Sequence, residues 1–373
     1  MQHLRKRQIV IVGSGLGAIA FCRAFRSRYA EITLITQESN FTPQVVLNAI
    51  AAGKLNPATY TRSLRVMFSK RKDIRILNQT ILTIDPEKRQ IVCDESDEPV
   101  SYDYLLFGNE SKDGGTAVHD YSSAMRLRDS LQDKGKLDTL AVIGPGTPAI
   151  ELATAFADLA RKVMLISSHD TLFLEAETPA ERKISAEIRK TGVHLFTVEE
   201  LDILEGTRLT LGRQTMDCDM VIDQRESTIP VCAKALGLEE IRKGILKTRP
   251  DFSIPQQPRL YTFADHCEIQ DGLGKKLPEL DRVTIHQARY LSRILKGKIE
   301  AVKGYDIDCP GFIYKGAGDF ARLHATSSVG KLGKYPVVGL IGMLIDTLLH
   351  KLPTFRIAYG GFGTWFQFSG HLK

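Results

Sequence analysis

The order of apolar runs, glycine turns and amphipathic segments along the chain predicts an α/β protein. Ile9 to Val12 is a continuous apolar run, which is typical of a strand buried on both faces of a parallel sheet. A segment with apolar residues at helical spacing follows it, and Ile32 to Ile35 supplies a second buried strand. Residues 8 to 36 are therefore predicted to form a strand, a turn, a helix and a parallel strand.

The same order of elements returns from Leu140 onward. We predict a strand to Ile143, a helix over Ile150 to Leu159 and a second strand over Val163 to Ile166. Short alternating segments separated by turn residues lie between the two units and predict a β-meander. Its strands are expected over Ile74 to Leu77, Ile81 to Ile84, Gln90 to Cys93 and Tyr104 to Phe107. Chance explains one such unit easily and two poorly, so a repeated fold is predicted.

The apolar spacing predicts several further elements. Helices are expected over Val45 to Ala52, Ala58 to Phe68, Ala180 to Lys190 and Asp281 to Leu295, and strands over Val193 to Phe196, Met220 to Ile222 and, as two strands around a glycine turn, Phe312 to Leu323. Pro336 to Leu352 is predicted to be an apolar helix between prolines, with only a narrow face of Gly339, Gly342, Asp346 and His350. Such a helix rises ~25 Å, short of the ~30 Å hydrocarbon core of a bilayer. It is expected to lie in a membrane interface or, equally, to be a dimerisation or core helix.

A glycine motif opens the first helix. Its residues are Gly13, Ser14, Gly15, Leu16, Gly17 and Ala18. Gly13 can take a tight turn, Gly15 lets the backbone approach a pyrophosphate, and the helix N-terminus directs its N–H groups at that anion. Ala18 replaces the third glycine of the usual motif. The first unit is therefore predicted to bind an adenine dinucleotide.

The second unit repeats this motif with Gly144, Gly146 and Ala149, and is predicted to bind a second dinucleotide. An acid at the end of the second strand normally binds the ribose of such a ligand. Thr36 stands there in the first unit and Ser167 in the second. The residues therefore do not distinguish NADH from NADPH.

The length and the net charge of the chain limit the number of domains and the kinds of partner. At 373 residues the chain is long enough for two or three domains. We predict one discontinuous domain of residues 1–115 and 225–300, a second of 116–224 and a small C-terminal region of 301–373. The net charge is +6, and residues 301 to 373 hold eight Lys or Arg against four Asp or Glu. This indicates either a solvated tail or attraction to an anionic surface. No nucleic-acid partner is predicted.

The cysteines and the N-terminus suggest a compartment. Six cysteines are scattered without Cys-x-x-Cys or metal-ligand spacing, which predicts reduced, mostly buried thiols and no metal site. The first strand begins directly after a short basic N-terminus, which leaves no room for a signal peptide. A cytoplasmic location is therefore expected.

The order of these motifs resembles the flavoproteins with two dinucleotide-binding domains, among them the rubredoxin and ferredoxin reductases and the type II NADH dehydrogenases. Tyr261 to Asp265 matches a late strand of this family, with Ala264 in place of the usual glycine, and Tyr102 to Phe107 matches the strand before its first crossover turn. The resemblance covers nearly the whole chain. It implies an α/β fold class of two Rossmann-like, three-layer ββα domains, the second inserted in the first, plus a small C-terminal α+β region.

The resemblance also implies cofactors and roles. FAD would bind the first domain and NAD(P)H the second. Asp265 would bond the flavin ribityl chain, Pro43 is the family's loop proline, and Glu151 matches an acid near the nicotinamide that would orient it. The family's Gln-rich quinone motif would fall at Arg282 to Gln287, where only Gln287 survives.

Departures from the family leave alternatives open. Thr36 replaces the ribose acid, Thr42 replaces a basic residue, and both crossover turns are rewritten, at Gly108 and at Asp223. The redox-active cysteine pair of the disulfide reductases is absent, which excludes that branch. We favour an FAD-dependent NAD(P)H oxidoreductase that passes electrons to a quinone or a small redox protein. The alternative is a non-catalytic binding or regulatory protein with weakened or lost FAD binding. Peripheral contact of residues 336–373 with the inner face of a membrane, and a homodimer, are left open.

Overall fold

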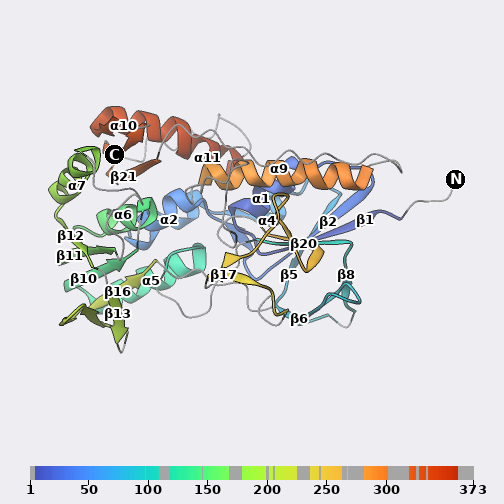
Figure 1. Ribbon diagram of the computed structural model, residues 1–373, viewed down its shortest axis with the longest axis horizontal. Coiled ribbons are helices and arrows are strands. Elements are labelled where there is room, and N and C mark those ends of the chain that lie inside the picture. Colours follow the sequence, from blue (N-terminus) through green and yellow to red (C-terminus); the bar gives the residue numbers. More distant parts are fainter. Residues whose placement is uncertain are drawn as a thin grey trace.

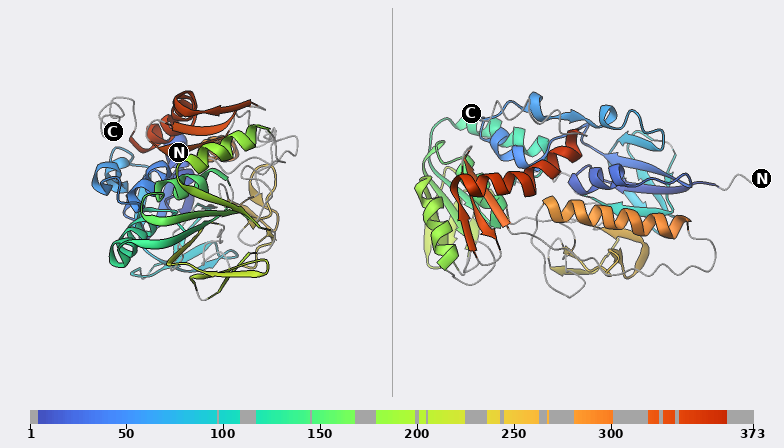
Figure 2. Two further views of the ribbon diagram at one scale, coloured as in Figure 1. Left: turned by 90° about the vertical axis from the view of Figure 1, so that its left-hand side faces the viewer. Right: turned by 90° about the horizontal axis from the view of Figure 1, so that it is seen from above.

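The computed structural model describes residues 5–96, 98–108, 117–144, 146–167, 179–198, 201–204, 206–224, 236–242, 245–262, 267, 281–300, 319–324, 327–332 and 335–359. The molecule is elongated, with one parallel sheet toward each end of its long axis (Figure 1). Helices of the C-terminal region and α9 lie along one side of it (Figure 2).

The first unit forms a six-stranded sheet ordered β19-β20-β9-β1-β2-β5 within the described residues. β1 (Arg7–Val12) pairs in parallel with β2 (Ala30–Thr36) and β9 (Tyr104–Phe107). β20 (Gln257–Thr262), which follows the second unit in sequence, pairs in parallel with β9. The remaining strands are β5 (Ile74–Asn78) and β19 (Ser253–Ile254). The chain thus returns to the first sheet, and the predicted insertion of the second domain into the first is confirmed.

Alternate residues of β1 face two different layers. Ile9 packs in a core with α1 (Leu16–Ala24) and α9 (Asp281–Glu300), whereas Val10 packs in a core with the meander. The meander strands are β6 (Ile81–Asp85), β7 (Gln90–Cys93) and β8 (Val100–Ser101), and β17 (Glu240–Arg242) and β18 (Ile245–Leu246) form a separate pair. Because both faces of β1 are covered, the strand is apolar throughout its buried length. The predicted three-layer arrangement is confirmed.

The second unit forms a four-stranded sheet ordered β12-β11-β10-β16 in the described residues, and all its pairings are parallel. The strands are β10 (Leu137–Ile143), β11 (Ala160–Ser167), β12 (Val193–Thr197) and β16 (Met220–Asp223). Leu140 faces a helical core and Ala141 faces a small antiparallel sheet. The helices are α5 (Tyr121–Lys134), α6 (Gly146–Ala155) and α7 (Pro179–Lys190), and the sheet is β13 (Leu201–Leu204), β14 (Arg208–Leu211) and β15 (Gln214–Asp217). The second unit therefore repeats the layers of the first.

Helix α2 (Gln44–Ala51) joins the two units. It belongs to the first unit by sequence, yet Leu47 and Ile50 lie in the same core as Leu140 and Ile150 of the second. All four side chains are essentially buried. Burial of this kind is worth roughly 1.5 to 3 kcal/mol per large apolar side chain, so α2 fixes one unit against the other.

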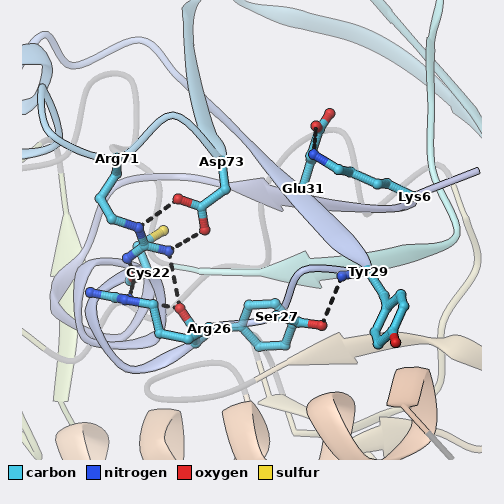
Figure 3. Close-up of polar contacts among 9 residues, drawn as sticks. Lys6, Cys22, Arg26, Ser27, Tyr29, Glu31, Arg71 and Asp73 are labelled. Carbon is cyan, nitrogen blue, oxygen red and sulfur yellow. Dashed lines mark hydrogen bonds and ion pairs between the residues drawn. The ribbon is translucent and has the colours of Figure 1, made fainter.

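The carboxyl end of α1 is held by cations, as Figure 3 shows. Arg71 donates to the carbonyl oxygens of Cys22 and Phe25 at 2.8 and 3.0 Å, and Arg26 donates to the Phe25 carbonyl at 2.7 Å. Asp73 accepts from Arg71 Nε at 2.6 Å and keeps the guanidinium in place. These groups satisfy the last carbonyls of the helix and stabilise its negative end. The opposite, positive end of α1 points at the Gly13 turn.

Two helix predictions were wrong in their limits. The helix expected over Ala58 to Phe68 is two short helices, α3 (Pro57–Tyr60) and α4 (Leu64–Met67), because β4 (Arg62–Ser63) pairs with β3 (Asn40–Phe41) between them. The helix expected from Ile150 begins four residues earlier, at Gly146. Apolar spacing could not detect this first turn, because glycine, threonine and proline occupy it.

The C-terminal region differs from the predicted single helix. Tyr335–Val338 is β23, which pairs with β22 (Ser327–Leu332), and β21 (Asp319–His324) completes that sheet. The helix starts only at Gly339, whose φ of 71° makes the turn from strand to helix. α10 (Gly339–Asp346) continues through a π-helical turn, Thr347–Lys351, into α11 (Leu352–Tyr359). The π-helical turn precedes Pro353. Proline has no backbone N–H, and its ring clashes with the carbonyl group four residues earlier, so a regular α-helix is disfavoured there. Residues 312–318, part of the predicted strand pair, lie outside the described residues.

The buried face of α10 is its small and polar face. A Cβ on Gly342 would lie 2.5 Å from the Ser328 carbonyl oxygen, so the helix packs directly on β22. Asp346 is fully buried and accepts a hydrogen bond from Ser328 Oγ at 3.1 Å. The apolar side chains point outward instead: Leu340, Ile341, Leu344 and Leu348 are 52 to 65% exposed. The alternative of a core helix is therefore wrong.

Gly342→Ala is expected to destabilise the protein by about 1 to 3 kcal/mol, because the new methyl group overlaps the backbone of β22. Thermal unfolding measures the change. Ile341→Ala, on the exposed face of the same helix, is the control and should change little. Equal melting temperatures for the two variants would contradict the packing of α10 on β22.

Candidate functional site

The first candidate site lies at the carboxyl edge of the first sheet, between β1 and β9. β1 lies between β2, which follows it through α1, and β9, which comes later in the chain. The strand order therefore reverses between β1 and β9, which makes this edge a topological switch point. Gly13 has a φ of 87°, which a side chain would strain, and its N–H donates to the Ile35 carbonyl at 2.8 Å. Gly15 is the N-cap of α1 with ordinary extended angles. Its backbone angles would suit any residue, so backbone conformation is not the reason for a glycine here.

Gly108 provides the space for the Ala18 methyl group, which replaces the third glycine of the motif. Ala18 is fully buried, and a Cβ on Gly108 would lie 3.2 Å from the Ala18 methyl group and 3.1 Å from the Val12 carbonyl oxygen. Gly108 also donates its N–H to Val12 at 2.8 Å. Gly17, beside Ala18 on α1, is buried as well, and Leu16 is half-buried. The crossover turn differs from the family pattern, but it keeps Gly108, the glycine that packs against Ala18 and Val12.

Hydroxyl groups occupy the place of the usual ribose acid. Thr36 Oγ1 donates to Ser14 Oγ at 3.0 Å, and both side chains are buried. The nearby acid, Glu38, contacts Ser122 at the start of α5 instead, and burial raises the pKa of its carboxyl despite that hydrogen bond. A neutral hydroxyl pair can still donate to and accept from a ribose hydroxyl, but it lacks the charge of a carboxylate.

The loop that follows β3 closes this edge. Pro43 precedes α2, and Thr42 Oγ1 lies 2.9 Å from Thr61 Oγ1. Gln44 donates to the Val118 carbonyl at 3.0 Å, which ties the loop to the segment leading into α5. Asp265, predicted to bond the ribityl chain, lies outside the described residues.

The second candidate site lies at the carboxyl edge of the second sheet, between β10 and β16. Gly144 and Gly146 have φ values of 150° and 75°. A Cβ on Gly144 would lie 3.1 Å from Gln224 Cβ and 3.4 Å from Ala149 Cβ, and Gln224 donates its N–H to the Ile143 carbonyl at 2.8 Å. Nothing but Pro148, at 3.8 Å, would meet a Cβ on Gly146. Gly144 is thus required by packing, whereas Gly146 faces open space at the start of α6.

Glu151 on α6 forms an ion pair that the sequence did not suggest. Lys351 Nζ, from the π-helical turn after α10, lies 2.8 Å from Glu151 Oε1. The two side chains are only 16% and 12% exposed, so the pair is largely shielded from water. The ammonium group restrains the position of the carboxylate. The C-terminal region therefore contributes a side chain to the second site.

α11 also contacts the first unit. Thr354 Oγ1 donates to the Asp281 carboxylate at the start of α9 at 3.1 Å, and Arg23 of α1 donates to the Ala358 carbonyl at 3.2 Å. Gln287 of α9, from the predicted quinone motif, is fully buried near Cys267. The segment from Lys351 to Ala358 therefore contacts both units. No sequence pattern predicted these contacts.

Burial suppresses the reactivity of two of the described thiols. Cys22, Cys93, Cys218 and Cys267 are all buried. Burial raises the pKa of Cys22 to about 12 and that of Cys218 to about 11, so both stay protonated at neutral pH. Since the thiolate is the reactive form, Cys22 and Cys218 are poor nucleophiles.

Comparisons with known proteins agree with this arrangement. A family model described as pyridine nucleotide-disulphide oxidoreductase matches residues 7–288. The type II NADH:quinone oxidoreductase Ndh of Mycobacterium tuberculosis is 21% identical over 402 residues, covering 94% of this chain and 84% of that protein.

Two solved structures share the fold. The structure of NDH2 from Plasmodium falciparum in complex with NADH has a TM-score of 0.76 at 16% identity, covering 95% of this chain and 97% of that one. The sulfide:quinone oxidoreductase of the bacterium Aquifex aeolicus has a TM-score of 0.74 at 14% identity, covering 95% and 92%. The predicted fold class is confirmed.

Proposed function

Because the chain belongs to the pyridine nucleotide-disulphide oxidoreductase family, as predicted from its motifs, we propose that it oxidises NAD(P)H and delivers the electrons through FAD to a quinone. The relative from Mycobacterium tuberculosis is an NADH:quinone oxidoreductase, which favours the enzyme over the non-catalytic alternative. The observation that carries the proposal is the pair of phosphate turns, each at the switch point of its own parallel sheet.

The first site suits the pyrophosphate of FAD. Gly15 has no side chain at the N-cap of α1, and α1 has no acid in its first turn to oppose an anion. Arg71 and Arg26 neutralise the negative, carboxyl end of α1. The positive, amino end of the same helix faces this site, where it favours an anion. When bound, FAD supplies the capacity to accept hydride and to release electrons to a second substrate. The residues 1–115 and 225–300 are proposed as its domain, with Asp265 as a further ligand.

The second site suits NAD(P)H, within the proposed domain of residues 116–224. Gly146 leaves space for the pyrophosphate at the start of α6, where free N–H groups are available. Glu151, held by Lys351, is proposed to orient the nicotinamide rather than to transfer a proton. Its restrained position one turn into α6 suits a positioning role.

The exposed face of α10 is proposed to contact the membrane that holds the quinone. Leu340, Ile341, Leu344 and Leu348 form an apolar patch, and lipid burial of such a patch is favourable. No helix within the described residues is long and apolar enough to cross a membrane. On the basis of the exposed patch we propose peripheral attachment, at the cytoplasmic face. A second copy of the chain on this patch is the competing arrangement, and a monomer in analytical ultracentrifugation would exclude it.

Titration of flavin-free protein with FAD tests the proposed function. The missing ribose carboxylate would contribute roughly 1.5 to 3 kcal/mol, or about one to two decades of affinity. FAD is therefore expected to bind noncovalently at micromolar concentration or below, and the loaded protein should reduce a soluble quinone with NADH. Asp265→Ala should weaken FAD binding further. Absence of binding at a 100-fold higher concentration, roughly 3 kcal/mol weaker, would leave only the non-catalytic alternative.

A further inference from the structure

The exposed side chains of α9 are all basic or histidine. One face of this twenty-residue helix is buried against α1 and β20, and the exposed positions are His286, Arg289, Arg293 and Lys296. Their spacing of three and four residues places them in one row along the helix, about 15 Å long. A solvated helix face normally mixes charges of both signs. This row does not, although Glu300 lies 3.9 Å from Lys296 at its end.

The cations in this row act on one another. The pKa of His286 is lowered by burial first and then by the positive charges of Arg289, Arg282 and Arg293. Arg289, Arg293 and Lys296 carry like charges on successive turns of the helix, and an anion bound along the row would relieve their repulsion.

The helix that carries the row lies on the same side of the molecule as α10. Seen from above, α9, α11 and α10 occupy one face (Figure 2). The hydrogen bond from Thr354 to Asp281 joins α11 to the first turn of α9, so the two surfaces have a fixed relation. Arg356 of α11 is also exposed. An apolar patch beside a basic row is the composition that suits a lipid–water interface.

We propose that the α9 row binds the phosphate groups of an anionic lipid surface on which the apolar patch of α10 rests. This inference depends on the proposed membrane contact and adds its lipid specificity and orientation. Nucleic acid would also match the charge, but it offers no partner for the exposed leucines and isoleucine. With one contact at α9 and another at α10, the long axis of the molecule would lie parallel to the membrane.

Vesicle cosedimentation of the FAD-loaded full chain tests the proposal. The variant Arg289→Gln, Arg293→Gln and Lys296→Gln is expected to bind vesicles of phosphatidylglycerol and phosphatidylcholine on the order of 100-fold more weakly than the unmodified protein, and vesicles of phosphatidylcholine equally well. The control is Lys88→Gln, Arg208→Gln and Arg213→Gln. These exposed residues lie on β14–β15 and at the β6–β7 turn, on the side of the molecule away from α9. The control should bind like the unmodified protein.

A second variant separates this proposal from the membrane contact itself. Leu344→Ser with Leu348→Ser should weaken binding to both kinds of vesicle. If it does so while the α9 variant binds anionic vesicles normally, the α9 row has no role and the membrane contact stands. If the unmodified protein pellets with neither vesicle, both ideas are wrong. Binding of duplex DNA in preference to anionic vesicles at the same ionic strength would also overturn the proposal.

Discussion

Gly15→Val is expected to abolish FAD binding and, with it, NADH oxidation by every electron acceptor. Gly15 has a φ of −62° and a ψ of 173°, which valine adopts without strain, so the fold should persist. The isopropyl group would stand where the pyrophosphate must approach the N-terminus of α1. We expect a loss of affinity on the order of 1000-fold, or about 4 kcal/mol, measured by quenching of flavin fluorescence.

Ala24→Val is the matched control for this experiment. It adds an isopropyl group to the same helix, at its exposed last residue and far from the phosphate turn. Circular dichroism and thermal unfolding should be similar for the two variants, while only Gly15→Val is colourless. A purified Gly15→Val protein with a full complement of flavin would show that the first turn does not hold the cofactor. Gly13 is less suitable, because its φ of 87° would add backbone strain.

Removal of one partner of the Glu151–Lys351 pair is expected to lower both stability and turnover. Glu151→Gln or Lys351→Met leaves a largely buried charge without its partner, which should cost about 2 to 4 kcal/mol in thermal or urea unfolding. The double variant removes both charges and should recover most of that stability. If Glu151 orients the nicotinamide, however, the double variant should remain on the order of 100-fold low in kcat/KM for NADH.

The pH profile decides between orientation and proton transfer. An orienting Glu151 predicts that Glu151→Gln lowers kcat/KM by the same factor at every pH tested, whereas a proton-transfer role predicts loss of one limb of the profile. Asp138→Asn is the control ion-pair variant, because Asp138 pairs with Arg161 at 3.1 Å with both side chains about three-quarters exposed. It should change stability by less than about 1 kcal/mol. Full activity in the double variant would exclude any role of Glu151 at the nicotinamide.

The sequence by itself determined the two βαβ units and their phosphate turns. The strands at Ile9 to Val12 and Leu140 to Ile143 lie where the apolar runs predicted, and the first helix begins at Leu16 as expected. These features depend on hydrogen bonds and burial within about 30 residues, so the local order of residues is sufficient. The strands expected in the meander were located for the same reason, because a period of two and a turn are local signals. Their grouping was wrong for Ile74 to Leu77 and Tyr104 to Phe107, which belong to the parallel sheet as β5 and β9.

The tertiary structure alone decided which face of α10 is buried. The sequence shows a broad apolar face and a narrow one of glycine and Asp346, and burial of the apolar face is the usual outcome. Here Gly342 allows the helix to approach β22, and Ser328 donates a hydrogen bond to the buried Asp346, so the apolar face remains outside. No local pattern could show this, because Ser328 belongs to another strand whose position depends on the whole C-terminal sheet.

The same limit applies to the site. Lys351 reaches Glu151 across 200 residues, and Thr36 reaches Ser14 across 22. Sequence motifs identified Glu151 and Ser14, but not what each contacts, since such contacts arise only after the helices and strands have packed. The ion pair depends on the π-helical turn that sets the direction of Lys351, and that turn depends on α10 lying against β22. Helix docking, a long-range event, therefore determines the partner of the residue proposed to orient the nicotinamide.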